Sequence, residues 1–515
     1  MPSAARRVIR SERLTAPPEH LGVLVEPGAA WIHGVLRSPP AHQGTLCDTP
    51  LTALRRRLRQ DLGLTGPVIA TGHQPEFYHA GVLAKTIAAL ALAAAHGGTA
   101  VYLTVDSDVP KSPRLTLPQR TAGGLRRIEM VLPMCDARQT YEEQPRVPRT
   151  AWLQFFGSLA ATHEFNDQSL LPTFARAWLT TEDAAPAYCD AFDRAEAATL
   201  AALGIAPVRS LRVSQLCTTP AFRTFAAHLI LNAAASAQAY NAAQAAYRIR
   251  HDVRARGRPV PPLAERGDAI ETPFWLHRPG EARRRLFVTS HGPAITLWAD
   301  DVRVGDVPVG ALQQVEPWPF ERDGWRLRPR ALALSAFARL LLADLFIHGI
   351  GGAKYDELME EWIAALLGAP PGPACCVSAT ACLPLPCREV RPADLAGARQ
   401  RSRDLRCNPQ RHVPAVPAEL RREWQTLVRR SDELGRNQSA DHAARRAVYQ
   451  ALQRVRGQML AADPWRAAQY DQAIATLTAQ WQADRIARDR EYFYALHPRA
   501  TLEQLVQVVR QAVAT

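Results

Sequence analysis

Ionisable residues gather where two short apolar runs of the sequence end. The run over 68–70 is followed by Thr71, Gly72, His73, Gln74 and, after a short polar loop, His79. The run over 343–347 is followed by His348, Gly349, Gly351, Gly352, Lys354 and Asp356. Histidines and a lysine beside a glycine-rich helix start are suited to binding phosphate and stabilising charge that develops on it.

Two further groups of polar residues could complete such a site. Asp106 and Asp108 end a third apolar run, and paired carboxylates often hold Mg²⁺. Asn241 and Arg248 lie about two turns apart in a helical segment, which suits substrate positioning, although the polar face of a helix is the simpler interpretation of either residue. We expect catalysis from His73, His79, Asp106 and Lys354, and ligand binding from Thr71, Gly72, Gln74, Lys85, Asp108, Asn241, Arg248, His348, Gly349, Gly351, Gly352 and Asp356.

The lysine content singles out three positions. Lysine and arginine total 62 residues, but the only lysines are Lys85, Lys111 and Lys354. Each lies in or beside one of the polar segments described above. Arginine cannot replace a compact ammonium group in a narrow site or one with a tuned pKa. Either the three lysines survive by accident in an arginine-rich sequence, or they have a function at the site, which we favour.

The elements that position these residues are predicted from hydrophobic patterning. A strand ending near residue 70, an alanine-rich helix over 81–96 and a strand over 99–105 form a βαβ unit, whose strands are parallel. A strand over 343–347, a glycine turn over 349–352 and a helix from 357 repeat the order. Ligands bind at the carboxyl ends of such strands. We therefore predict one parallel sheet from 61–110 and 330–390, with His73 and His348 facing one crevice.

The expected architecture is an α/β fold, a Rossmann-like parallel-sheet core with helical and small β insertions and a C-terminal helical hairpin or coiled coil. The predicted segments are an N-terminal extension (1–60), the first part of the core (61–115), a mostly helical insertion (116–200), core-associated helices (201–264), a small antiparallel β insertion (265–320), the second part of the core (321–394) and the C-terminal helices (395–515). Within the last segment we expect one helix near 417–460 and a return helix near 466–490.

The amino-acid composition indicates which broad class of protein this chain belongs to. A hydrophobic content of 47% is that of a globular chain, and no apolar stretch reaches membrane-spanning length. The N-terminal residues lack the apolar core of a secretory signal, and an odd number of cysteines, nine, suggests reduced thiols, so a cytoplasmic location is expected. The net charge of +13 comes from dispersed arginines rather than a basic patch with interleaved aromatics, so we do not expect nucleic-acid binding.

Common catalytic motifs are missing from the sequence. It has no G-x-S-x-G elbow, H-E-x-x-H helix or G-x-G-x-x-G fingerprint, and the residues around Lys354 do not form a Walker A loop. His79-Ala80-Gly81 is similar to part of the HxGH signature of class I nucleotidyl-transfer folds, but Val82 replaces the second histidine. The spacing of Cys375, Cys376, Cys382 and Cys387 fits no common zinc pattern.

In the order of these features, the chain resembles the superfamily of the cysteine-adding enzyme of bacillithiol biosynthesis (BshC). The matching features are the Thr71-Gly72-His73-Gln74 loop, the acidic cluster at 106–108, the glycine-rich strand end at 348–356 and the C-terminal helices. The resemblance implies a Rossmann-like core and an ATP-assisted ligase that joins cysteine to an amino-sugar conjugate. His73 stands where the family has a glutamine, and the acidic cluster lacks the family's histidine.

The sequence leads to one main hypothesis and two alternatives. The main hypothesis is a ligase that condenses cysteine, or a related amino acid or thiol donor, with an amine-bearing small molecule, with ATP or ADP and Mg²⁺ as cofactors. The alternatives are a nucleotidyltransferase-type enzyme and a non-catalytic nucleotide-binding protein with a coiled-coil partner surface. Ionisable residues at both strand ends favour an enzyme. A homodimer through the C-terminal helices is a further hypothesis.

Overall fold

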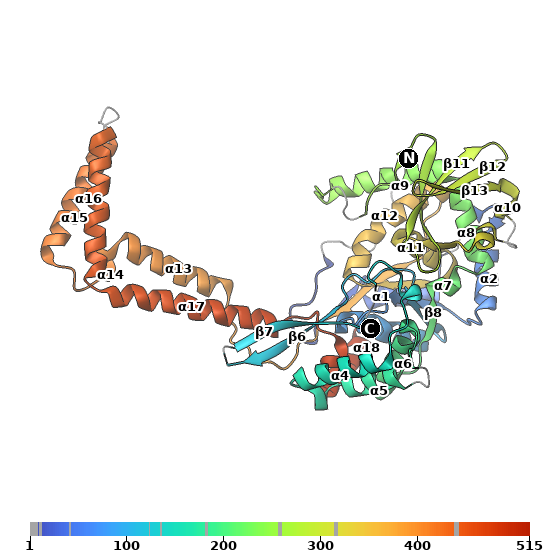
Figure 1. The fold of residues 1–515 in the computed structure, drawn as a ribbon, viewed down its shortest axis with the longest axis horizontal. Coiled ribbons are helices and arrows are strands. Elements are labelled where there is room, and N and C mark those ends of the chain that lie inside the picture. Colours follow the sequence, from blue (N-terminus) through green and yellow to red (C-terminus); the bar gives the residue numbers. More distant parts are fainter. Residues whose placement is uncertain are drawn as a thin grey trace. The chain divides into compact units, whose positions relative to one another are not determined.

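The computed structural model of the chain separates into two units. It describes residues 9, 13–40, 43–122, 124–133, 136–180, 184–255, 260–313, 318–436 and 442–514. The first unit comprises 1–117, 128–383 and 490–515, and the second comprises 118–127 and 384–489 (Figure 1).

A mixed sheet of six strands forms the centre of the first unit. Its order is β1 (Val23–Glu26), β16 (Ala374–Ala379), β15 (Leu345–His348), β4 (Val68–His73), β5 (Thr99–Thr104) and β8 (Arg209–Arg212). Strands β16, β15, β4, β5 and β8 pair in parallel, and β1 pairs antiparallel with β16. The prediction that 61–110 and 330–390 contribute to one parallel-containing sheet is therefore confirmed.

The strand order reverses direction between β4 and β15. From β4, the helix α3 (Ala80–Ala95) leads to β5 on one side, whereas from β15 the helix α12 (Ile350–Leu367) leads to β16 on the other side. In open α/β sheets, ligands bind where such a reversal leaves a crevice beyond the strand ends. The β4–α3–β5 unit matches its predicted boundaries closely.

The N-terminal segment, predicted as an extension of the core, contributes a strand to the main sheet and packs on the core. Its strand β1 closes one edge of the main sheet. The helix α1 (Ala29–Arg37) packs against the C-terminal helix α18 (Arg499–Ala514), and α2 (Leu51–Asp61) packs against the turn over Ala338–Leu342 that precedes β15. The short hairpin of β2 (Thr45–Leu46) and β3 (Thr49–Pro50) precedes α2. The strand β1 has four residues, too few for its alternation to be distinctive.

The segment predicted as a small antiparallel β insertion contributes most of an antiparallel sheet, and one strand of that sheet lies beyond the predicted end at residue 320. The strands β13 (Val302–Pro308), β12 (Ala294–Ala299), β11 (Arg284–His291), β10 (Ala269–His277) and β14 (Arg326–Pro329) lie in that order, and β9 (Glu265–Arg266) pairs with β10. Between the β5 and β8 strands lie β6 (Arg114–Thr121), β7 (Gly124–Val131), α4 (Arg149–Thr162), α5 (Leu171–Leu179) and α6 (Tyr188–Ala202). The aromatic residues Trp152, Phe155, Phe156 and Trp178 of these helices pack around Phe77 and each other.

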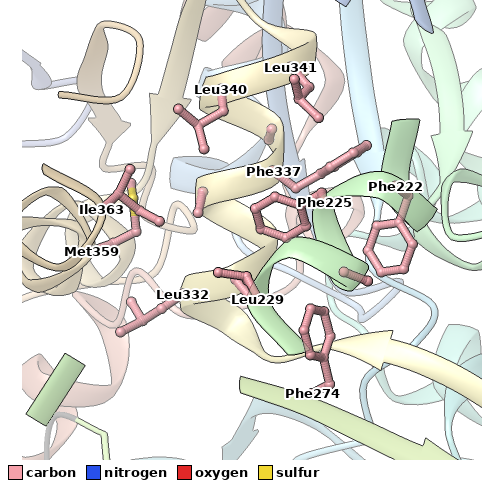
Figure 2. Packing of buried hydrophobic residues seen from close by; sticks show 14 of the residues in the cluster. Phe222, Phe225, Leu229, Phe274, Leu332, Phe337, Leu340, Leu341, Met359 and Ile363 are labelled. Carbon is pink, nitrogen blue, oxygen red and sulfur yellow. The ribbon is translucent and has the colours of Figure 1, made fainter. Parts of the chain in front are cut away.

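The main core lies where helices from distant parts of the sequence meet (Figure 2). It joins α7 (Val213–Leu216), α8 (Pro220–Leu231), α9 (Ala233–Arg250), α11 (Ala331–Phe337), the π-helical turn η5 (Ala338–Leu342) and α12. Phe222 and Phe225 of α8 pack edge-on against Phe337 of α11, with ring centroids 5.4 Å and 5.6 Å apart. Leu332 belongs to this core and to the wall of the cavity described below, so packing holds that wall in place.

The second unit is mostly helical, as predicted, but its helices differ from the predicted hairpin. It contains α13 (Pro392–Cys407), α14 (Pro409–His412), α15 (Ala418–Arg436), α16 (His442–Ala461) and α17 (Pro464–Ala487). The single helix expected over 417–460 is two helices that pack on each other, and 437–441 lie outside the described residues. The return helix α17 begins at the predicted break, after the N-cap Asp463, and packs on α13.

After the second unit, the chain rejoins the first through an aromatic segment. Tyr492, Phe493 and Tyr494 are buried, and the Tyr494 N–H donates to the Tyr78 carbonyl oxygen at 2.9 Å. The segment continues into the amphipathic helix α18 (Arg499–Ala514), which packs on α3. Burial of these aromatic rings and the packing of α18 hold the C-terminal segment on the core of the first unit.

Two remaining features, membrane-spanning helices and cysteine pairing, are described for the residues that the structure covers. None of the helices in the described ranges is long and apolar enough to cross a membrane. The eight cysteines that the structure describes are free thiols, and Cys135 lies outside the described residues.

Candidate functional site

A cavity of about 950 Å³ lies within the first unit, at the carboxyl ends of β4 and β15. Residues of both strand ends line it, and His73 and His348 face this same cavity, as the parallel topology predicts. Of the predicted site residues, it brings together Gly72, His73, Gln74, His79, Lys85, Asp108, His348, Gly349, Gly351, Gly352 and Lys354. It is large enough for a nucleotide-sized ligand.

All three lysines of the chain line this cavity. Lys85 comes from α3, Lys111 from the segment after β5, and Lys354 from the first turns of α12. Within the described residues, no lysine forms an ion pair with a carboxylate, whereas arginines form most of the ion pairs of the structure. The lysine charges are therefore not neutralised by the protein and are available to an anionic ligand.

His73 presents a neutral imidazole to the cavity. Its Nδ1 lies 3.0 Å from the Gln74 carbonyl oxygen, and since a carbonyl only accepts hydrogen bonds, Nδ1 carries the proton. Burial and the nearby positive charge of Lys85 lower the pKa of His73 to about 3, although the hydrogen bond to Gln74 acts in the opposite direction. The Nε2 atom is consequently an unprotonated acceptor for an N–H or O–H group of a ligand.

His79 caps the helix α3. Its Nδ1 accepts a hydrogen bond from the Gly81 N–H at 3.0 Å, so the neutral ring carries its proton on Nε2, which lies 3.4 Å from a carboxylate oxygen of Glu491. Burial and the positive charge of Arg490 lower the pKa of His79 to about 3. The residue predicted to be catalytic thus also has a structural role, which its position before the helix allows.

The junction of β15 and α12 differs from the predicted glycine turn. The helix begins at Ile350, so Gly351 and Gly352 lie in its first turn, and Gly349 is its N-cap. A glycine has no side chain with which to cap the free N–H groups of the first turn. A Cβ atom on Gly351 would meet nothing within 4 Å outside its own helix backbone, so a ligand can approach these N–H groups closely.

His348 is held from behind by a buried ion-pair network. Its Nε2 lies 3.1 Å from the Asp356 carboxylate, which also pairs with Arg339. Burial alone would raise the pKa of Asp356, but Arg339 and His348 lower it to about 2. Asp356, predicted to bind ligand, does not line the cavity and instead orients His348.

Asp106 and Asp108 do not form the predicted Mg²⁺ site. The Asp106 carboxylate is buried and accepts hydrogen bonds from the N–H and hydroxyl of Ser214, away from the cavity. Burial and the negative charge of Glu142 raise the pKa of Asp106 to about 6. Asp108 lines the cavity and is shared by the Gln74 amide and Arg283, each at 2.9 Å. The two carboxylates therefore have separate structural partners, and no other group of His, Cys, Asp and Glu in the described ranges could hold a metal ion.

Three other predicted ligand-binding residues lie outside the cavity lining. The Thr71 hydroxyl donates to the Ile347 carbonyl oxygen at 2.8 Å and ties β4 to β15. The Asn241 amide holds the backbone of Leu263, and the Arg248 guanidinium holds the carbonyl oxygens of Val253 and Arg254. For Asn241 and Arg248, the simpler interpretation, polar residues with structural contacts, is correct.

Sequence reasoning missed an aromatic and basic part of the cavity wall. Trp275 of β10 lies under the guanidinium groups of Arg283 and Arg330, each 4.9 Å from the centroid of its ring. Arg283 also donates to the Ser107 carbonyl oxygen at 3.0 Å. The β insertion and α11 contribute these residues, and a single arginine among so many gives no sequence signal.

Ser378 at the end of β16 and Arg490 were missed for a different reason. The Arg490 guanidinium donates to the Ser378 hydroxyl at 2.9 Å, and both residues line the cavity. Residues 14–16 also contribute to the lining. These residues reach the site only through contacts between segments that are far apart in the sequence.

Comparison with models of known protein families found no family that matches the chain, and comparison with curated proteins found no match.

Proposed function

We propose that the chain is an enzyme of the ligase class that condenses cysteine, or a related amino acid or thiol donor, with an amine-bearing small molecule, assisted by a nucleotide. The observation that carries the proposal is that the three lysines of an arginine-rich chain line one cavity without carboxylate partners among the described residues. Uncompensated ammonium groups in a concave site favour a ligand with several negative charges.

The phosphate groups of the nucleotide are assigned to the first turn of α12. The free N–H groups of this turn and the helix dipole favour an anion, and the glycines allow its close approach. Lys354 adds a positive charge from the same turns. A bound nucleotide would supply the activation of a carboxylate that condensation with an amine requires.

A neutral histidine acceptor beside these cations suits the handling of protons in such a reaction. An amine that forms a C–N bond must lose a proton, and the unprotonated Nε2 of His73 can hold that N–H group in place. Asp356 keeps His348 oriented at the end of the neighbouring strand, β15. Substrate, phosphate and proton acceptor would thus meet between β4 and β15.

The strand order supports a Rossmann-like interpretation of the core. The connection from β4 leads to one side of the sheet and the connection from β15 leads to the other. Rossmann-like folds form their ligand crevice at such a point. Resemblance to the cysteine-adding enzymes of bacillithiol biosynthesis contributes the choice of a ligase, and the departure at His73 leaves the identity of the amine open.

The proposal is tested by incubating the purified protein with ATP, the twenty amino acids and a pool of amino sugars and other small amines. We expect ATP breakdown that depends on both an amino acid and an amine, together with a product whose mass equals their sum minus water. Lys354→Gln should lose this turnover while unfolding at the wild-type temperature.

Other outcomes would identify one of the alternatives. Release of pyrophosphate with a nucleotide joined to the acceptor would identify a nucleotidyltransferase. Nucleotide binding without turnover in the assay, and without accumulated amines in a deletion strain, would contradict an enzymatic function and favour a binding protein.

A further inference from the structure

Lys85 differs from the other two lysines of the cavity in its burial. Its side chain is inside the protein, with the residue only 4% exposed, whereas Lys354 is half-buried and Lys111 is exposed. The Nζ atom donates a hydrogen bond to the Gly72 carbonyl oxygen at 2.6 Å. Among the residues that the structure describes, no carboxylate lies within ion-pair distance of it.

The surroundings of Lys85 raise the share of the neutral amine, although the ammonium ion still predominates near pH 7. Burial lowers the pKa of Lys85 to about 8, although the thiol of Cys376 and the carboxyl group of Glu196 act in the opposite direction. About a tenth of the side chain is therefore an unprotonated amine at pH 7, far more than for an exposed lysine, and this amine is a nucleophile. Arginine has no equivalent reactivity, which gives a chemical reason for a lysine here.

The space around Lys85 permits attack on a ligand. Its Cδ atom lies 3.8 Å from the place where a Cβ atom on Gly349 would be, so the missing side chain leaves the amine beside the open start of α12. Lys111 and Lys354 line the same cavity and attract anions to it. An anionic molecule held there would lie next to a buried amine.

We propose that Lys85 forms an imine with the carbonyl carbon of an anionic aldehyde or keto acid that enters this cavity. The unprotonated Nζ attacks the carbonyl carbon, and transfer of one amine proton to the carbonyl oxygen through solvent gives a carbinolamine. The hydroxyl group then leaves as water together with the second amine proton, and a C=N bond remains. The reaction needs no oxidant or further reactant. This activity goes beyond the proposed ligase and does not rest on nucleotide binding.

The alternative is that Lys85 only anchors the Gly72 carbonyl. The two roles are distinguished by labelling with pyridoxal 5′-phosphate and, separately, with glyoxylate, which has a carboxylate and no phosphate. Each imine is reduced with borohydride, and the modified lysine is identified by peptide mass spectrometry. Because the chain has only three lysines, Lys111 and Lys354 are internal controls in every sample.

With both probes, we expect Lys85 to be labelled at least tenfold faster than Lys111 and Lys354, with a rate that rises between pH 7 and pH 9. In protein unfolded by urea, the three lysines should react at similar rates. Lys85→Arg should abolish the fast label, and the wild-type map decides the question even if that variant fails to fold. Absence of label from Lys85, or equal labelling of all three lysines in the folded protein, would overturn the proposal; fast labelling by only one probe would keep it and assign the anion as phosphate or carboxylate.

Discussion

The two helix N-termini that border the cavity both have glycine at the second position, but the first turn of one is capped and crowded and that of the other is open. Helix α3 follows β4 and α12 follows β15, and each has a glycine as its second residue, Gly81 and Gly351. The first turn of α3 is closed, because His79 caps it and the Arg490 and Ala379 atoms crowd Gly81. The first turn of α12 has a glycine cap and open space. A βα junction can serve as an anion site only where the protein leaves its N–H groups free, and we propose this role for the start of α12.

Alanine substitutions at these two glycines should differ strongly in their effect on the free energy of unfolding. At Gly81, a Cβ atom would lie 2.8 Å from the Ala379 carbonyl oxygen, so Gly81→Ala should lower the free energy of unfolding by about 2–3 kcal/mol. Gly351→Ala meets no obstacle and should be neutral or stabilising by up to about 1 kcal/mol, while weakening ligand binding. Urea unfolding of both variants measures the difference, and equal stabilities would show that the α3 start is not closed.

The capped start of α3 should also make the stability of the protein depend on pH, because His79 is held neutral there. The pKa of His79 is about 3 in the folded protein and near 6.5 in the unfolded chain, so only the unfolded state binds this proton between those values. Its contribution to stability is therefore complete above pH 6.5 and is lost as the pH falls towards 3. Asparagine keeps an N-cap acceptor without titrating, so His79→Asn should lose roughly 1.5 kcal/mol less than wild type between pH 7 and pH 5.

The measurement is urea unfolding of wild type and His79→Asn at both pH values. His73 and His497 also have pKa values of about 3 and remain in the variant, so some loss on acidification should persist. Parallel stability profiles for the two proteins would mean that the His79 ring is not held neutral by the fold.

The sequence was sufficient to predict the parts of the site that depend on local pattern. The apolar runs and the parallel topology predict that His73 and His348 face one crevice, and both residues line the same cavity. The rarity of lysine distinguished three side chains that share one cavity, whereas the abundance of arginine concealed Arg283 and Arg330.

The missed features depend on contacts between distant segments. The strand β1 pairs with β16 about 350 residues later, and Trp275 reaches the cavity from a separate sheet. Asp106 and Asp108 are two residues apart, yet Ser214 holds one and Arg283 the other, which no spacing rule reveals. The glycines at 349–352 suggested a turn, but the helix starts there because Ala353, Leu358 and Met359 are buried by its packing.

Isothermal calorimetry with ATP and ADP tests the central claim, that the open start of α12 and Lys354 bind a phosphorylated ligand, most directly. The wild-type protein should bind at least one nucleotide below millimolar concentration. Lys354→Arg keeps the charge and changes only its shape and hydration, and it should bind at least tenfold more weakly, a loss of about 1.4 kcal/mol. No binding by wild type at millimolar nucleotide, or equal binding by the arginine variant, would contradict the account.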